Sequence, residues 1–419
     1  MNALRFVHAA DLHLDSPFRG LSEVAPGLQS IMQEATFQAF QGIVDLCLQQ
    51  KVDFLIIAGD IHDSSNRSLR ALVRLRNEFE RLAEHHIPVL LCHGNHDPLS
   101  GWGAKFSWPK NVHVFKSGEV EAQSLYRNDI EIARVYGVSY ATEQVSENLA
   151  KAFCKEDDAP WSIGLLHTNV GHDPNHHNYA PCTIQDLLEA HMDYWALGHV
   201  HTHRVLHKAH PTIIYPGNSQ GRHPREPGPR GCVLVNVRET GQVQYELVPV
   251  DVVRWYDETI SIEGKRDLEE LLSHIDDHIH RLCQQNGNRS LVIRWILEGR
   301  SPLHHELTKP GRLEDILSTL RDKWGTGSVF VWSESIQDHT KRAVDIDALR
   351  LEDNLLGDFL RLMSQRDPTF LEELKGAVAP LFDDPRIARY VKAPSDDQFR
   401  AWMHMAEQQG IDRLMAGEE

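Results

Sequence analysis

The sequence predicts an α/β domain, followed by a small α+β domain and a helical C-terminal region. In the first part of the chain, short apolar runs such as 54–58 alternate with segments of helical periodicity such as 31–47. The next part has the order strand, helix, strand, helix, strand, which is typical of a small α+β unit. Beyond it the apolar spacing is helical throughout. We therefore expect domains at 1–250, 251–340 and 341–419.

The composition is that of an ordinary globular protein, with 41% hydrophobic and 25% charged residues among 419. The net charge of −17 argues against a protein that coats nucleic acid non-specifically. It does not exclude an enzyme that acts on nucleic acid, because bound cations and local basic patches can reverse the field at a cleft. The six scattered cysteines predict reduced thiols, and no apolar run approaches the roughly 18 residues of a membrane span. The N-terminal residues also lack a signal-peptide pattern, so we expect a cytoplasmic protein without membrane contact.

The first two predicted strands are each followed by residues that can bind a metal ion. After the strand 4–9 come Asp11 and His13, which project to the same side of an extended chain and can share one ion. The apolar block 53–58 is typical of a strand buried on both faces, as in an α/β or a two-sheet core, and Asp60 follows it. Asp15 is expected to be a turn residue or to support a ligand, and His62 and Asp63 could be ligands, supporting residues or substrate contacts.

Three later apolar runs end in the same way. The run 86–92 precedes Gly-Asn-His-Asp, 161–166 precedes His167, and 194–197 precedes Gly-His-Val-His. Strand ends gather along one edge of a sheet, and neutral imidazole is a common metal ligand. The sequence therefore predicts one metal site built from seven residues: Asp11, His13, Asp60, Asn95, His167, His199 and His201. Three further histidines are expected to be solvated loop residues: His172, His176 and His177.

The predicted ligands are oxygen and imidazole donors without thiolate. This set suits Mn²⁺, Fe²⁺ or Zn²⁺ better than it suits a structural zinc site, and Mn²⁺ is our first expectation. Two cations that share one carboxylate, about 3.5–4 Å apart, can clamp a phosphate and lower the pKa of a bridging water. Burying so many polar groups for fold stability alone would cost several kcal/mol, so a purely structural role is disfavoured.

These motifs, in their order and spacing, resemble the full series of the calcineurin-like metallophosphoesterases. The series consists of Asp11-x-His13, Gly59-Asp60, Gly94-Asn95-His96-Asp97, His167 and Gly198-His199-x-His201. Within that superfamily, the segments 8–14 and 198–203 are similar to the SbcD-type DNA repair exonucleases. The run 215–223 and the segment 252–255 are similar to the YhaO branch of that group.

The resemblance implies two facing mixed β-sheets flanked by helices, and it implies roles for single residues. One metal would be held by Asp11, His13, Asp60 and His201. The other would be held by Asp60, Asn95, His167 and His199. His96 would contact the scissile phosphate and assist the leaving oxygen. Protein Ser/Thr phosphatases of this superfamily carry Gly and Arg where this chain has Leu14 and Ser64, which counts against that branch.

A loop rich in Gly, Pro and Arg follows the last ligand motif. Its basic residues contact substrate phosphates or form a solvated loop, and our candidates for substrate binding are Arg204, Arg222 and Arg225. The leading hypothesis is a DNA phosphodiesterase, an exonuclease with endonuclease activity as a further option. The alternatives are a phosphodiesterase for a small nucleotide or lipid-linked substrate, and a metal-stabilised non-catalytic subunit.

The helical C-terminal region carries apolar stripes that either pack on the chain's own core or dock a partner. Three apolar side chains there are candidates for exposure: Phe399, Trp402 and Met403. The resemblance implies a coiled-coil SMC-like ATPase as that partner, and the sequence has no phosphate-binding Gly-rich loop of its own. A homodimer is a further expectation.

Overall fold

The computed structural model describes residues 3–18, 26–66, 68–102, 106–156, 158–171, 179–287, 289–364, 368–383 and 394–415. By its internal contacts the chain divides into two compact units. The first comprises Met1–Ser261, Asp267–Glu298 and Leu307–His339, and the second comprises Ile262–Arg266, Gly299–Glu306 and Thr340–Glu419. Among the described residues, no helix is long and apolar enough to cross a lipid bilayer.

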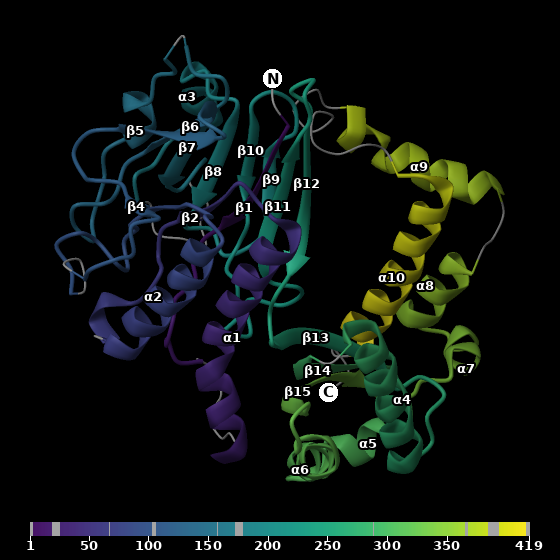
Figure 1. The fold of residues 1–419 in the computed structure, drawn as a ribbon. Coiled ribbons are helices and arrows are strands. Elements are labelled where there is room, and N and C mark those ends of the chain that lie inside the picture. The colour runs from purple at the N-terminus through teal and green to yellow at the C-terminus, as the bar shows by residue number, and fades with distance from the viewer. Residues whose placement is uncertain are drawn as a thin grey trace. The chain divides into compact units, whose positions relative to one another are not determined.

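Two six-stranded mixed sheets form the N-terminal part of the first unit, as predicted (Figure 1). The first sheet has the order β12-β11-β1-β2-β3-β4, and the second has the order β5-β6-β7-β8-β10-β9. The strands of the first are β1 (Leu4–Ala9), β2 (Phe54–Ala58), β3 (Val89–Cys92), β4 (Val112–Val114), β11 (Gly231–Val237) and β12 (Val243–Pro249). The strands of the second are β5 (Glu121–Arg127), β6 (Ile130–Gly137), β7 (Ser162–His167), β8 (Tyr194–Gly198), β9 (Arg204–His207) and β10 (Thr212–Tyr215). The ligand-bearing strands β1, β2 and β3 run parallel, as do β7 and β8, so their carboxyl ends meet at common edges.

The inner faces of the two sheets pack against each other. Phe6 of β1 stacks on Phe54 of β2, with ring centroids 4.9 Å apart, and meets Tyr194 of β8 edge-on at 5.3 Å. All three side chains are fully buried. Phe54 and Tyr194 are the first residues of their strands, so this contact joins the two sheets away from the carboxyl ends that the predicted ligands follow.

Helices cover the outer faces of both sheets, and local sequence explains where they begin. The helices and 3₁₀ turns of this part are α1 (Pro26–Gln50), η1 (Ser64–Asn66), α2 (Leu69–Glu84), η2 (Leu149–Ala152) and α3 (Ile184–Glu189). Ser68 caps α2 by accepting a hydrogen bond from Ala71 N, and Thr183 forms a capping box with Asp186 at α3. The buried face of α2 carries Leu72, Leu75, Phe79 and Leu82 at helical spacing.

A three-stranded sheet, ordered β13-β14-β15, follows in the chain. Its elements are β13 (Val253–Ser261), α4 (Leu268–Asn286), β14 (Ser290–Arg300), α5 (His304–Leu307), α6 (Arg312–Trp324) and β15 (Val331–Lys341). This is the predicted strand-helix order with one short extra helix, α5. Trp255 of β13 and Val292 of β14 share a buried cluster with Met32 of α1, so this sheet packs against the N-terminal part of the same unit.

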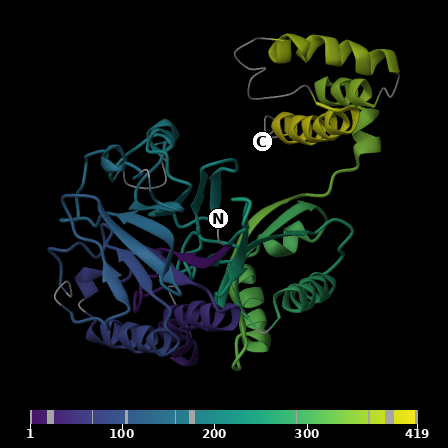
Figure 2. The ribbon, with the colours of Figure 1, turned by 45° about the horizontal axis from the view of Figure 1, so that its top comes forward.

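The second unit contains α7 (Ile346–Arg350), α8 (Leu355–Met363), α9 (Pro368–Asp383) and α10 (Asp396–Met415). These helices, at the yellow end of the colour scale, lie beside one another (Figures 1 and 2). A small core of Leu356, Leu360 and Ile411 joins α8 to α10. The prediction of exposed apolar residues on the last helix is wrong for Phe399, which is 5% exposed, and right for Trp402, which is 42% exposed. Met403 is partly exposed.

Candidate metal centre

The loops after β1 and β2 are joined by backbone hydrogen bonds. Asp11 N donates to Gly59 O at 3.1 Å, and His13 N donates to Asp60 O at 3.0 Å. Asp11, His13 and Asp60 have φ values of 51°, 43° and 51°, in the left-handed region that residues other than glycine seldom adopt. Such backbone persists only where the surroundings enforce it, and it is concentrated at functional sites.

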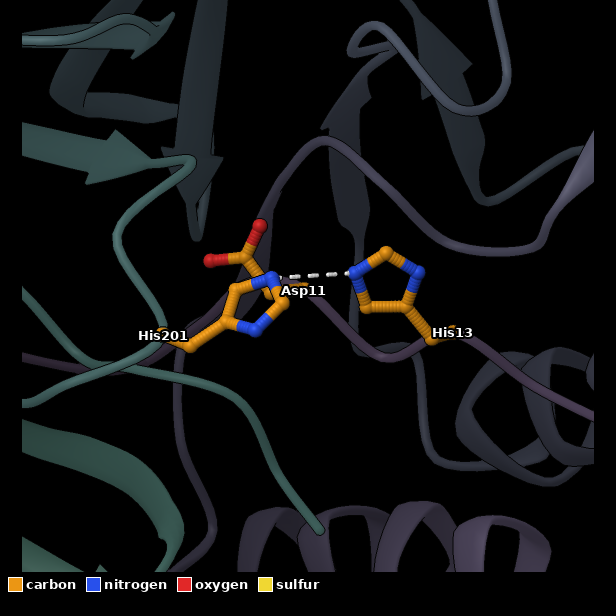
Figure 3. A group of neighbouring side chains, drawn as sticks. All are labelled: Asp11, His13 and His201. Atoms are coloured by element: carbon orange, nitrogen blue, oxygen red, sulfur yellow. Dashed lines mark hydrogen bonds between the residues drawn. The ribbon is translucent and has the colours of Figure 1, made fainter. Parts of the chain in front are cut away.

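The first donor cluster consists of Asp11, His13 and His201, whose ligand atoms lie within 4.8 Å of one another (Figure 3). The Nε2 atoms of His13 and His201 are 3.2 Å apart. Behind them, His13 Nδ1 lies 2.9 Å from Asp63 Oδ1 and His201 Nδ1 lies 2.6 Å from Glu226 Oε1. Because a carboxylate only accepts, each Nδ1 carries the proton and each Nε2 presents a lone pair. Two facing lone pairs, with the Asp11 carboxylate beside them, fit a bound cation.

The second donor cluster consists of Asp60, His167 and His199, again with ligand atoms within 4.8 Å of one another. His167 Nδ1 donates to Ala58 O at 2.9 Å, so its Nε2 points into the centre and can bind a cation that displaces its proton. That Nε2 faces two acceptors, Asn95 Oδ1 at 3.1 Å and Asp60 Oδ2 at 3.4 Å. Such a set of acceptors also fits a divalent cation.

Asp60 lies between the two clusters. Its Oδ2 is 3.9 Å from His13 Nε2 in one cluster and 3.4 Å from His167 Nε2 in the other. The backbone N–H of His199 donates to both oxygens of Asp11, at 3.1 and 3.2 Å, and so ties the second cluster to the first. All seven residues predicted from the sequence as ligands are thus brought together, with Asp60 in the shared position.

His96 stands at the open side of the site. Its Nδ1 lies 2.9 Å from Asp63 Oδ1, and its side chain is 46% exposed, whereas the histidines of the two clusters are less exposed. Burial alone would lower the pKa of His96, but the hydrogen bond to Asp63 and the charge of Asp60 raise it. An accessible imidazole with a raised pKa can donate a proton to a substrate atom.

Asp97 supports the ligand loops through the backbone. Its carboxylate accepts hydrogen bonds from the N–H groups of Asp60 (3.2 Å), Ile61 (3.0 Å) and Gly94 (2.7 Å). Gly94 leaves no room for a side chain, because a Cβ there would lie 2.3 Å from Asp60 Oδ1 and 2.8 Å from His167. The loops after β2 and β3 are therefore locked against each other.

The electrostatics of the centre favour a mixture of charged and neutral ligands. Burial, helped by the positive charge of Arg222, lowers the pKa of His13 to about 4 and keeps it neutral. Burial raises the pKa of Asp11 to about 6. Burial opposes a charged His167, but the Asp60 carboxylate outweighs this and raises the pKa of His167 to about 9. In the metal-free centre His167 therefore carries a proton that a bound cation would displace.

The three predicted substrate-binding arginines occupy different places. Arg222 has a side chain only 12% exposed, and its guanidinium Nη1 lies 3.8 Å from Asp63 Oδ2, beside the centre. Arg204 and Arg225 are exposed, at the start of β9 and in the loop after β10. Their contact with substrate stays a prediction. The loop histidines His172, His176 and His177 lie outside the described residues.

Sequence reasoning left the role of Asp63 open and missed two supporting residues, Asp97 and Glu226. Asp63 and Asp97 stand within the ligand motifs, where an acidic residue beside a histidine could have been taken as its support. Glu226 is a single acid in a loop of Arg, Pro and Gly, 25 residues from its partner His201. No local pattern marks it.

Comparisons with known proteins agree with this geometry. The family described as calcineurin-like phosphoesterase matches residues 4–203, and the middle domain of metallophosphoesterase YhaO matches residues 255–341. The chain is 36% identical over 346 residues to the uncharacterized metallophosphoesterase YhaO of Bacillus subtilis (strain 168), which covers 83% of this chain and 84% of the relative. It is 26% identical over 303 residues to the DNA double-strand break repair protein Mre11 of Methanopyrus kandleri, covering 64% of this chain and 61% of the relative. For the protein of the same name from Sulfurisphaera tokodaii the identity is 22% over 313 residues, with 72% and 75% covered.

Proposed function

Because the chain belongs to the calcineurin-like metallophosphoesterases and has a middle domain of the YhaO type, we propose that it is a two-metal phosphodiesterase that hydrolyses DNA, chiefly as an exonuclease. The observation that carries the proposal is the pair of donor clusters with Asp60 between them. Mn²⁺ is the favoured ion, since the ligands are imidazole and oxygen donors without thiolate.

Each residue of the centre has a distinct task in this reaction. Two bound divalent ions supply the positive charge that holds a phosphate group and acidifies a water molecule. Asp60, which lies between the two donor clusters, would contribute its carboxylate to both ion positions. His96, held through Nδ1 by Asp63, turns Nε2 toward the leaving oxygen and gives it a proton. Arg222 pairs with a phosphate oxygen at the edge of the site.

Support for DNA as the substrate comes from the relatives and from the loop arginines. Two relatives that match most of this chain are named DNA double-strand break repair protein Mre11. Arg225 is exposed on the same loop that places Arg222 beside the centre, so the loop can follow a phosphate backbone away from the scissile bond. A small diester would need only the inner arginine.

The direct test compares three substrates with the purified protein and Mn²⁺: linear double-stranded DNA, single-stranded DNA and bis-p-nitrophenyl phosphate. We expect metal-dependent hydrolysis of the diester and of at least one DNA substrate, and loss of both activities with a chelator. Hydrolysis of the small diester without any DNA cleavage would favour the alternative, a phosphodiesterase for a small nucleotide or lipid-linked substrate.

We also propose that the C-terminal helices dock a coiled-coil SMC-like ATPase. Leu355, Trp402 and Met405 expose 70%, 42% and 52% of their surface there. The sequence contains no phosphate-binding Gly-rich loop, so any ATP-driven step requires another chain. Co-purification of such an ATPase with the full chain, and its loss when Leu355 and Trp402 are replaced by Ser, would support docking. Equal recovery with both proteins would contradict it.

A further inference from the structure

The loop between β10 and β11 packs directly on the segment that carries His201. Asn218 N donates to His201 O at 3.1 Å, and the Arg230 guanidinium donates to the same carbonyl. Gly217 allows this approach, since its φ is +82° and a Cβ there would lie 2.7 Å from His201 O. Hydrogen bonds to the backbone of His201 therefore hold the loop against the segment that carries this ligand.

Glu226 makes two contacts from the centre of this loop. Its Oε1 accepts the Nδ1 proton of His201 at 2.6 Å, and its Oε2 accepts the backbone N–H of Arg222 at 2.7 Å. The first contact sets the tautomer in which His201 Nε2 can bind a cation. The second fixes the backbone from which the Arg222 side chain reaches Asp63. One carboxylate thus serves an ion ligand and a cationic side chain.

The middle-domain strand β13 holds the same loop from its other side. Gln220, 1% exposed, accepts from Val252 N at 2.8 Å and donates to Val253 O at 2.5 Å. Trp255 donates its indole N–H to Gly221 O at 3.1 Å, and its own carbonyl accepts from Gly228 N at 2.9 Å. These contacts bracket Glu226 on both sides in the sequence.

We propose that Glu226 is a positioning residue that sets His201 for the metal and Arg222 for the substrate phosphate at once, and that strand β13 of the middle domain keeps it in place. The proposal rests on the two-metal phosphodiesterase function but not on DNA as the substrate. It makes the middle domain part of the catalytic geometry. A change that loosens β13 from the loop should weaken the metal centre through Glu226.

The variant Glu226→Gln tests the proposal, because a carboxamide has one accepting oxygen where two are needed. Either the amide N–H₂ faces the Arg222 N–H, or it faces His201 Nδ1 and forces the proton onto Nε2. We expect Mn²⁺ affinity, measured by calorimetry, to fall by about 10–100-fold. At saturating Mn²⁺ we expect a raised KM for bis-p-nitrophenyl phosphate. Glu239→Gln, an exposed acid in the β11–β12 turn, should change neither quantity.

Arg222→Ala separates the two tasks, since it keeps the backbone N–H that Glu226 binds. It should raise KM without lowering Mn²⁺ affinity, because it removes a positive charge beside the centre, and its effect on KM should not add to that of Glu226→Gln. Glu226→Asp, which keeps the charge but is too short for both partners, should show a smaller loss of Mn²⁺ affinity. A lower melting temperature with unchanged Mn²⁺ affinity and KM in both Glu226 variants would overturn the proposal.

Gln220→Ala tests the role of β13, with the exposed Gln242→Ala as its control. We expect weaker Mn²⁺ binding than in the parent, in the same direction as Glu226→Gln. Unchanged Mn²⁺ affinity in a folded Gln220→Ala protein would overturn the part assigned to β13. Mn²⁺ binding is measured without any substrate. A failure to cleave DNA would therefore contradict DNA as the substrate without affecting this test.

Discussion

Three of the four imidazoles in the two clusters owe their orientation to the group behind them. His13 has Asp63 behind its Nδ1, His201 has Glu226, and His167 has the carbonyl of Ala58. All three partners are acceptors, so all three rings turn Nε2 toward the centre, where a cation can bind. The residue types predict metal binding, and the partners determine which atom binds.

The substitution Asp60→Asn tests the role of the carboxylate that lies between the two clusters. The substitution keeps the shape of the side chain but removes the charge between the clusters, where Oδ2 lies within 4 Å of both His13 Nε2 and His167 Nε2. We expect loss of bound Mn²⁺, measured by elemental analysis, and loss of diester hydrolysis. Asp129→Asn, in an exposed turn, should keep both. Two bound metals and near-normal turnover in Asp60→Asn would disprove the shared role.

His96→Ala should separate proton donation from metal binding. The side chain contacts Asp63 and faces solvent, so its removal leaves the seven ligands in place. We expect kcat to fall by about 10²–10⁴-fold, the usual contribution of a general acid, with the metal content unchanged. A parallel loss of metal would show instead that His96 is a ligand.

Metal binding should strengthen as pH rises. His167 in the metal-free protein has a pKa of about 9, above the ordinary value of 6.5, so below pH 9 a cation must displace its proton. Affinity should therefore rise by about tenfold per pH unit between pH 7 and 9 for one competing proton. The same shift stabilises the metal-free fold below pH 6.5, and that contribution is lost as the pH rises through about 9. Calorimetry in two buffers of different ionisation enthalpy measures the released proton, and a pH-independent affinity would refute this account.

At the scale of elements, the sequence indicates central strands well and edge strands poorly. The buried strands β2 and β8 are continuous apolar runs, and the metal-ligand residues follow each of them directly. One short stretch of sequence therefore predicts both the strand and the position of its ligands. The edge strands β5, β9 and β12 were not predicted, because their exposed positions carry polar residues and break the apolar pattern.

Contacts between distant elements could not be predicted for a different reason. The bond between His201 and Glu226 depends on a loop folding back over 25 residues, and nothing in the local sequence of either residue requires it. Phe399 shows the same limit, since periodicity indicates an apolar side of α10 but not which part of it other side chains cover.

The two arginines of the loop after β10 should differ in their effects. Arg225 is exposed, and Arg222 lies beside Asp63. Arg225→Ala should lower the salt slope of DNA binding by about one unit and leave bis-p-nitrophenyl phosphate hydrolysis unchanged. Arg222→Ala should impair both substrates. An unchanged salt slope in Arg225→Ala would show that Arg225 is a solvated surface residue that does not contact DNA.

At the scale of the whole molecule, the metal centre is built entirely from residues of the first unit. Within the second unit, Asp412 of α10 forms ion pairs with Arg300 and Lys341, the last residues of β14 and β15. Partly exposed pairs of this kind contribute about 0–1 kcal/mol each. A chain that ends at Lys341 should therefore fold, bind two Mn²⁺ and hydrolyse bis-p-nitrophenyl phosphate as the full chain does. An insoluble or metal-free product would show that the C-terminal helices belong to the catalytic core.

The central claim is that two ions share Asp60 between the two donor clusters. Crystals grown with Mn²⁺ and measured at the manganese absorption edge test it directly. We expect two anomalous peaks, one among Asp11, His13 and His201 and one among His167 and His199, each in contact with Asp60. A single peak, or peaks that leave Asp60 on one ion only, would contradict it.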